Sequence, residues 1–332
     1  KKSVSIDLKT PKGKEIIFKL IKKSDVFISN IRKSALSRLG FDHKSFLKYN
    51  DKIISAFAVG FSSNGPYRDL PAYDDIIQAA SGMASYQEAY SDQPSYTSGA
   101  TADKATGLML ALGVVSSLFK RNNDNKDIEV EVPMFETMVD FTLVEHLYGF
   151  NFIPPKDKPV YPRQSSPNRK PYKTKDGYIA VLPYNDEQWL RFLKFIKKEY
   201  LIKTKKFSTL ENRNKNVDEL YSLLVKELKK EKTNFWIKKL REIDIPSMKV
   251  NKPQDLFVDE HLEKTNFFRT YKHSTEGDLM YPRLPVYFNN ETDNESKFEA
   301  PNLGNKTKEI LIDLGYNKNE IESLRKDRVI FY

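Results

Sequence analysis

An aspartate surrounded by small residues is the first candidate for chemistry in this sequence. Asp103 lies in the segment TSGATADKATG, and a strongly apolar stretch, Thr106–Phe119, follows it directly. A carboxylate at the start of a helix is stabilised by the free N–H groups and by the helix dipole. The small neighbours leave room for a bulky acyl group, so Asp103 is a candidate nucleophile. The alternative is an N-cap without chemistry, because aspartate is among the preferred capping residues.

A second candidate, for binding, is the loop that follows an expected strand. The segment SNIRKSALSRLG, residues 29–40, carries Arg32, Lys33 and Arg38. Proteins of the α/β class hold ligands at the carboxyl ends of parallel strands, and arginine offers a phosphate two parallel donors. These residues could therefore contact phosphate groups. A strand-to-helix connection with solvated basic side chains is an equally good interpretation of the segment taken alone.

Other kinds of site find little support in the sequence. The chain has no cysteine, which excludes a disulfide scaffold, a thiolate metal site and a cysteine nucleophile. Its four histidines, His43, His146, His261 and His273, have no metal-ligand spacing and accompany no Gly-x-Ser-x-Gly motif. Gly-x-Gly-x-x-Gly and Walker loops are absent from the sequence as well. We therefore expect neither a metal site nor a serine–histidine triad.

The elements that position these candidates alternate between strand and helix patterns. The expected strands are Ser3–Leu8, Asp25–Ile28, Lys52–Phe61 and Asp127–Val132. One expected helix begins at Thr10-Pro11. The other expected helices cover Lys44–Tyr49, Tyr73–Met83, Thr106–Phe119 and Pro133–Tyr148, the last two as buried helices. Such alternation predicts an α/β fold with a mainly parallel sheet that helices cover on both faces.

The length of 332 residues and a proline-rich stretch predict two domains. Residues 1–150 form the expected large α/β domain. Residues 151–171 form a linker, because six prolines between Phe152 and Pro171 prevent a helix or a central strand. Residues 172–252 form the expected smaller α+β domain, and residues 253–332 a linker with C-terminal helices that return to the large domain.

The composition indicates a globular protein, with 39% hydrophobic residues. The net charge of +10 could favour binding of nucleic acid or of a small polyanion. The lysines are dispersed, however, and the sequence contains no recognisable nucleic-acid-binding module. We therefore favour solvated lysines and expect no nucleic-acid partner. No stretch is expected to approach the roughly 18 apolar residues that span a bilayer, and the first residues have no signal-like apolar core. A soluble, cytoplasmic protein without a membrane partner is the expectation.

Several segments, in order along the chain, resemble the motifs of one enzyme family. SVSIDLKTPKG, DVFISNIRKSALSRLGF, GFSSNGPYRDLPAYDDIIQAASGM and TSGATADKATG are followed by KPYKTKDGYIAV, NDEQW, DIPSMKV, APNLGNKT and LGYNKNEI. Their order and spacing resemble the class III coenzyme A (CoA) transferases, also called the CaiB/BaiF or carnitine dehydratase and bile-acid-inducible family, which includes formyl-CoA transferase. The resemblance implies a Rossmann-like large domain, a smaller α+β domain and an intertwined homodimer.

The resemblance also implies roles for single residues. Asp103 stands where the family has its catalytic aspartate. The implied CoA contacts are Ile6, Asp7, Leu8 and Lys9 at a strand end, Asn30, Ile31, Arg32 and Arg38 in the basic loop, Pro71, Ala72, Tyr73 and Asp74 along a channel, and Met134 near the thioester. The implied reaction moves CoA from an acyl-CoA to a small carboxylic acid through a covalent aspartyl-CoA intermediate on Asp103, without a metal.

The sequence departs from the family pattern at places that bear on the CoA site. It starts after the family's first strand–helix unit, so part of the adenine and phosphate site is expected to be missing from this sequence. Ile31 replaces the Phe, and Lys33 and Ser34 replace the Pro-Gly, of the family's "NFRPG" loop. Asn305 and Lys306 replace the Glu-His of its C-terminal motif. No glycine-rich flap is found near residues 165–172, which argues against oxalate as a substrate.

Alternatives to the transferase stay open at this point. An acyl-CoA racemase of the same fold needs a histidine before the aspartate of an "HD" motif, and this position is Tyr73, whose phenol is a poor proton shuttle. A CoA-dependent dehydratase or isomerase is a variant of that alternative. A truncated, inactive paralogue and a basic binding protein belong to other classes. An Asp103→Ala substitution separates them, since only an enzyme that uses Asp103 would lose turnover.

Overall fold

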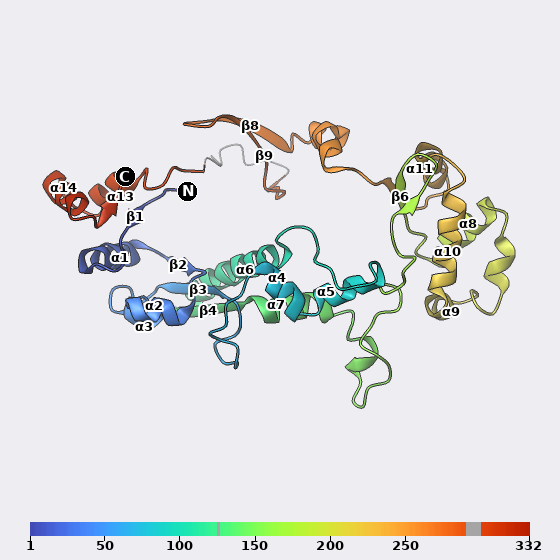
Figure 1. Ribbon diagram of the computed structural model, residues 1–332, viewed down its shortest axis with the longest axis horizontal. Coiled ribbons are helices and arrows are strands. Elements are labelled where there is room, and N and C mark those ends of the chain that lie inside the picture. Colours follow the sequence, from blue (N-terminus) through green and yellow to red (C-terminus); the bar gives the residue numbers. More distant parts are fainter. Residues whose placement is uncertain (125–126, 290–299) are drawn as a thin grey trace. The chain divides into compact units, whose positions relative to one another are not determined.

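The computed structural model describes residues 1–124, 127–289 and 300–332. The chain divides into two compact units (Figure 1). Unit 1 comprises Lys1–Ser81, Ser98–Asp140 and Phe267–Tyr332, and unit 2 comprises Gly82–Thr97 and Phe141–Asn266. These boundaries differ from the expected ones, because residues 82–97, 141–150 and 253–266 belong to unit 2. That the two units are separate domains stays a prediction.

A parallel sheet of three strands forms the centre of unit 1. Strand β3 (Ile54–Val59) lies between β2 (Val26–Ser29) and β4 (Ile128–Pro133), and both pairings are parallel. The run ISAFAV of β3 is almost entirely buried, as expected for a central strand that is covered on both faces. The predicted α/β fold with a parallel sheet is therefore confirmed.

Helices complete the core of unit 1. The helices are α1 (Pro11–Lys23), α2 (Lys33–Leu39), α3 (His43–Leu47), α4 (Asp74–Ala80), α6 (Thr101–Asp124), α7 (Met134–Leu143), α13 (Thr307–Asp313) and α14 (Lys318–Lys326). One apolar cluster joins α1, α2 and α3 to the sheet through Ile21, Leu36, Phe46 and Phe57. The Thr10 hydroxyl accepts a hydrogen bond from the Gly13 N–H at 3.0 Å, so α1 begins where its capping sequence predicted.

The first expected strand does not join the parallel sheet. Strand β1 (Ser5–Ile6) pairs antiparallel with β10 (Ile330–Phe331), so the two ends of the chain lie side by side (Figure 1). Ile16 of α1 packs against Leu311 and Ile321 from the last two helices. The C-terminal helices therefore return to the N-terminal part of unit 1. A hairpin of β8 (Phe268–His273) and β9 (Gly277–Pro282) is a further part of this unit.

The apolar helix α6 differs from its prediction in burial. It was expected to be buried, but Leu108, Leu112, Val115 and Phe119 are 75%, 60%, 64% and 72% exposed. Their spacing of four, three and four residues places them in one stripe along the helix. Residues Thr101–Asn122 are also long and apolar enough to cross a membrane, so the expectation that no stretch reaches this length is wrong. Length and composition do not distinguish such a span from a helix that another protein surface covers.

Helix α7 is shorter than predicted and only partly buried. It ends at Leu143 rather than Tyr148. Met138 is fully buried, whereas Phe141 is 61% exposed. The apolar residues of this helix therefore contribute to the core on one side only.

Unit 2 is built around a small antiparallel sheet and several helices. Its strands are β5 (Tyr172–Lys173), β6 (Tyr178–Val181) and β7 (Ser247–Lys249), in that order across the sheet. Its helices are α5 (Met83–Tyr86), α8 (Asp186–Phe195), α9 (Leu210–Lys215), α10 (Val217–Leu228), α11 (Thr233–Glu242) and α12 (Glu260–Lys264), with 3-10 helices at Gln87–Ala89, Tyr148–Asn151, Glu199–Lys203 and Pro253–Val258. Trp189, Phe192, Leu224 and Trp236 form the centre of its core. Residues 152–171, the proline-rich stretch, contain neither helix nor strand.

Candidate functional site

A cleft of about 840 Å³ opens in unit 1 where the parallel strands end. Asn30, Gly60 and Met134 line it, and each directly follows the last residue of β2, β3 or β4. This edge of a parallel sheet is the usual place for ligands in α/β proteins, because the loops that leave the strands converge there. The cleft is therefore the candidate functional site.

Six residues predicted for the site line this cleft: Asn30, Arg32, Ala72, Tyr73, Asp103 and Met134. Leu8 and Ile31 line a neighbouring pocket of about 410 Å³, which shares Asn30 and Leu110 with the cleft. Pro71 and Asp74 are adjacent in sequence to lining residues but do not line the cleft themselves. The structure does not bring Ile6, Asp7, Lys9 or Arg38 to either pocket among the residues that it describes. Their contacts with CoA stay predictions of the resemblance.

Asp103 occupies the first turn of α6 with an exposed side chain. It is not the N-cap that the alternative interpretation required, since the helix begins two residues earlier, at Thr101. The Asp103 N–H donates a hydrogen bond of 3.0 Å to Oδ1 of Asp74. The other oxygen of Asp74 accepts from Nε2 of Gln78 at 2.6 Å. Asp74 thus satisfies a free N–H of α6, and the Asp103 carboxylate lines the cleft beside the positive end of the helix.

Another wall of the cleft depends on a close approach of two backbones. Gly60 lies where β3 ends, and a Cβ atom at this position would be 2.3 Å from the Cβ of Ala72. Only a residue without a side chain permits this distance. Residues 68–73, which carry Arg68 and Tyr73 along the cleft, can therefore lie directly against the end of the strand.

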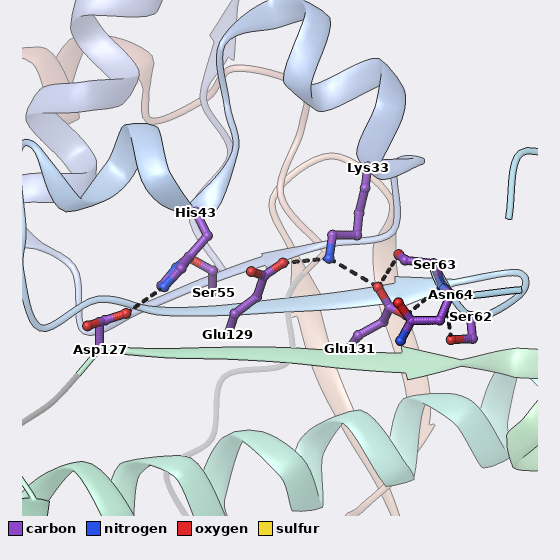
Figure 2. A network of polar contacts seen from close by, with 9 residues as sticks. All are labelled: Lys33, His43, Ser55, Ser62, Ser63, Asn64, Asp127, Glu129 and Glu131. Atoms are coloured by element: carbon purple, nitrogen blue, oxygen red, sulfur yellow. Dashed lines mark hydrogen bonds and ion pairs between the residues drawn. The ribbon is translucent and has the colours of Figure 1, made fainter.

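A polar network joins the start of α2 and the loop after β3 to β4, as Figure 2 shows. Nζ of Lys33 lies 2.5 Å from Glu129 and 3.0 Å from Glu131. Glu131 also accepts hydrogen bonds from the Ser63 N–H, at 2.8 Å, and from the Ser63 hydroxyl. Lys33 and Ser63 both line the cleft. The carboxylate of Glu131 therefore connects the start of α2 with the loop after β3.

The ionisation of this pair follows from its surroundings. Burial disfavours the charged form of Lys33, but the hydrogen bonds to Glu129 and Glu131 outweigh it, so the pKa of Lys33 is raised. Burial also acts against the charged form of Glu131. The hydrogen bonds from Ser63 and from Lys33 outweigh that effect, and the pKa of Glu131 is lowered. Both groups are thus held in their charged forms.

Figure 2 also shows a separate group of a serine, a histidine and an aspartate, which is not suited to nucleophilic catalysis. His43 lies 2.9 Å from Ser55 through Nδ1 and 2.9 Å from Asp127 through Nε2 (Figure 2). Ser55 is fully buried, so a substrate cannot reach its hydroxyl. Within residues 1–124, 127–289 and 300–332, no group of three or more histidine and acidic residues could hold a metal.

The prediction missed several lining residues that the structure brings to the cleft. Thr106 and Gly107 lie one helical turn after Asp103, and this spacing could have identified them. Arg68 and Leu70 are in the motif that the resemblance used, but no pattern distinguished them from their neighbours. The Nη1 atom of Arg32 donates to the Asp69 carbonyl at 3.1 Å, a contact across 37 positions of sequence that spacing could not reveal.

Comparisons with known proteins address the identity of the chain as a whole. The family model described as "CoA-transferase family III" matches residues 1–307. The chain is 29% identical to an (R)-2-hydroxy-4-methylpentanoate CoA-transferase of Clostridioides difficile, with 100% of this chain and 83% of that protein covered. It is 28% identical to a cinnamoyl-CoA:phenyllactate CoA-transferase of Clostridium sporogenes, with coverages of 99% and 81%. A crystal structure of a CaiB/BaiF family protein from Brucella suis superposes with a TM-score of 0.75, at 24% identity and coverages of 94% and 81%.

Proposed function

Because this chain belongs to CoA-transferase family III, we propose that it moves CoA from an acyl-CoA thioester to a carboxylic acid with Asp103 as the nucleophile. The observation that supports this role is the position of Asp103. Its exposed carboxylate lines the cleft at the carboxyl edge of the sheet, in the first turn of an apolar helix. Gly107 and Thr106 beside it leave space for an acyl group to approach.

The proposed reaction proceeds through carboxylate exchange. An Asp103 oxygen attacks the thioester carbonyl, the C–S bond breaks, and a mixed anhydride and the CoA thiolate result. The thiolate attacks the Asp103 carbonyl carbon and releases the donor acid, which leaves an aspartyl-CoA thioester. The acceptor carboxylate then attacks this thioester, expels the thiolate and forms a second mixed anhydride. Attack of the thiolate on the acceptor's carbonyl gives the new acyl-CoA and regenerates the Asp103 carboxylate.

The residues of the cleft suit the two ends of an acyl-CoA. Arg32 and Arg68 are the lining arginines, and their guanidinium groups can donate to phosphate oxygens. Phe61, Leu110 and Met134 are apolar lining residues that can contact an acyl chain. Both relatives are named for acids with an apolar side chain, 2-hydroxy-4-methylpentanoate and phenyllactate. We therefore propose an acid of this kind, a 2-hydroxy acid with an apolar side chain, as a substrate.

The exposed stripe of α6 supports the proposed homodimer and the proposed cytoplasmic location. Leu108, Leu112, Val115 and Phe119 form an apolar surface that a water-soluble monomer would leave uncovered. The family resemblance implies an intertwined homodimer, in which a second copy would cover this surface. Covered in this way, α6 needs no membrane.

Detection of the covalent intermediate tests the proposed function. The chain is incubated with an acyl-CoA of a 2-hydroxy acid, treated with hydroxylamine to convert an aspartyl thioester into a hydroxamate, and digested with trypsin. The modified mass is expected on the peptide Asp69–Lys104, with fragmentation assigning it to Asp103. In the Asp103→Asn variant, the adduct is expected to be absent and turnover to fall by at least about 1000-fold. An adduct that persists in this variant, or turnover that survives, would show that Asp103 is not the nucleophile.

A further inference from the structure

Unit 2 contains a separate pocket of about 170 Å³. It lies between the N-terminal end of α8, helices α9 and α10, and residues 161–163. Two arginines, Arg163 and Arg213, line it together with the aromatic side chains of Tyr184 and Trp189. All lining residues belong to unit 2, so the pocket is complete within one compact part of the chain.

Arg163 is a half-buried cation without an acidic partner among the described residues. Its guanidinium group lies 5.5 Å from the ring centres of both Tyr161 and Tyr184. Its Nε atom donates to the Tyr161 hydroxyl at 3.3 Å, and the other group that stabilises its charge is the phenol of Tyr221. None of the carboxylates in the described part of the chain forms an ion pair with it. Its positive charge in the pocket is therefore not neutralised.

Arg213 is the second arginine that lines the pocket, and groups of the chain already accept from its guanidinium nitrogens. This side chain is 3% exposed, its Nη1 atom donates to the Phe207 carbonyl at 2.8 Å, and its Nη2 atom pairs with Asp186. Its Nε atom has no hydrogen-bond partner among the described residues, but it is buried and so is not accessible to a ligand in the pocket. The carboxylate of Asp186 balances one of the two arginines, so the pocket keeps one net positive charge.

We propose that this pocket binds a small organic carboxylate with an aromatic or apolar group. The carboxylate oxygens accept hydrogen bonds from the guanidinium group of Arg163, as arginine favours planar carboxylates. The apolar group packs against Trp189 and Tyr184. The small volume admits a free acid and excludes a nucleotide or an acyl-CoA. Because binding is measured without turnover, the site stands or fails separately from the reaction proposed for Asp103.

Isothermal titration calorimetry of the full chain with benzoate as the probe tests the proposal. Benzoate is expected to bind the unmodified chain, whereas benzyl alcohol, which lacks the charge, is not. Arg163→Gln is expected to weaken benzoate binding by about ten-fold or more, because a charge-assisted hydrogen bond is lost. Lys194→Gln is the control, since it removes one exposed positive charge from α8, whose first residues line the pocket, at a position that does not line it. It is expected to bind benzoate as the unmodified chain does.

Two further variants distinguish binding in this pocket from binding in the cleft of unit 1. Tyr184 is 64% exposed, so Tyr184→Ala removes one wall of the pocket without disturbing the core, and weaker binding is expected. Arg68→Gln, which removes a lining cation of the cleft in unit 1, is expected to bind benzoate unchanged. Equal affinity in the unmodified chain and in Arg163→Gln would overturn the proposal, as would loss of binding in Arg68→Gln. Inorganic phosphate binding as tightly as benzoate would overturn the assigned class of ligand.

Discussion

At the scale of single residues, the cleft depends on the absence of a Cβ atom at Gly60. A methyl group at this position would lie 2.3 Å from the Cβ of Ala72, so Gly60→Ala must displace the segment that carries Arg68 and Tyr73. We expect a loss of stability of about 1–3 kcal/mol from overpacking and a KM for the acyl-CoA that rises by about ten-fold. Thermal unfolding and steady-state kinetics measure the two effects.

Gly65→Ala provides the matched control for that substitution. A Cβ at Gly65 would have its nearest contact at 3.5 Å, with the Ser62 carbonyl, which is an ordinary distance. This variant is expected to keep the KM of the unmodified chain. If Gly60→Ala and Gly65→Ala behaved alike, the close approach at Gly60 would not shape the cleft.

The residues that could be predicted from sequence are those that a motif or a helical spacing identifies. Asp103, Asn30 and Tyr73 were named from their places in motifs, and the structure brings all three to one cleft. The contact of Lys33 with Glu131 could not be predicted, because 98 positions separate the two residues and neither belongs to a charge pattern. Distant contacts of this kind depend on how strands align, which the sequence of either segment alone does not contain.

At the scale of elements, Glu131 is expected to link α2, the loop after β3, and β4 in a pH-dependent manner. Its pKa is lowered on folding, so its contribution to stability is complete above the ordinary glutamate value of 4.5 and is lost as the pH falls through the folded value. The pKa of Lys33 is raised, so its contribution is complete below 10.5 and is lost as the pH rises through the folded value. The link is therefore fully formed between pH 4.5 and 10.5.

Glu131→Gln measures this contribution. Because the side chains of Lys33 and Glu131 are 31% and 20% exposed, we expect a loss of about 1–3 kcal/mol at neutral pH, measured by urea unfolding. The difference from the unmodified chain should shrink as the pH falls below 4.5. Glu211→Gln is the control, since its pair with Lys215 is exposed on both sides and is expected to contribute little. A difference that stayed constant down to low pH would contradict the ionic link.

The elements themselves were mostly predictable, whereas their burial was not. Strand β3 lies within the expected range Lys52–Phe61 and helix α1 begins where expected, because one has a clear apolar run and the other a capping residue. Helix α6 is longer than expected and far more exposed. An apolar sequence shows only that a helix must be covered, and not by which surface.

At the scale of the whole molecule, the order of motifs was the strongest signal in the sequence. No single segment identified the family, but their succession did, and the family match over residues 1–307 confirms both this recognition and the enzyme class, a CoA-transferase. The boundaries of the two units were harder to predict. Residues 82–97 belong to unit 2, although the residues on either side belong to unit 1. The local composition does not indicate that this segment belongs to the other unit.

The exposed stripe of α6 leads to a prediction about assembly. If a second copy covers Leu108, Leu112, Val115 and Phe119, the chain is a dimer in solution, and a charge in the stripe must weaken it. Leu112→Glu is expected to weaken dimerisation by at least about ten-fold, because burial of one leucine is worth about 1.5–3 kcal/mol. Light scattering after size-exclusion chromatography measures the mass, with Lys120→Glu as a control on the same helix outside the stripe. A monomeric unmodified chain, or one that floats with lipid vesicles, would show that something other than a second copy covers α6.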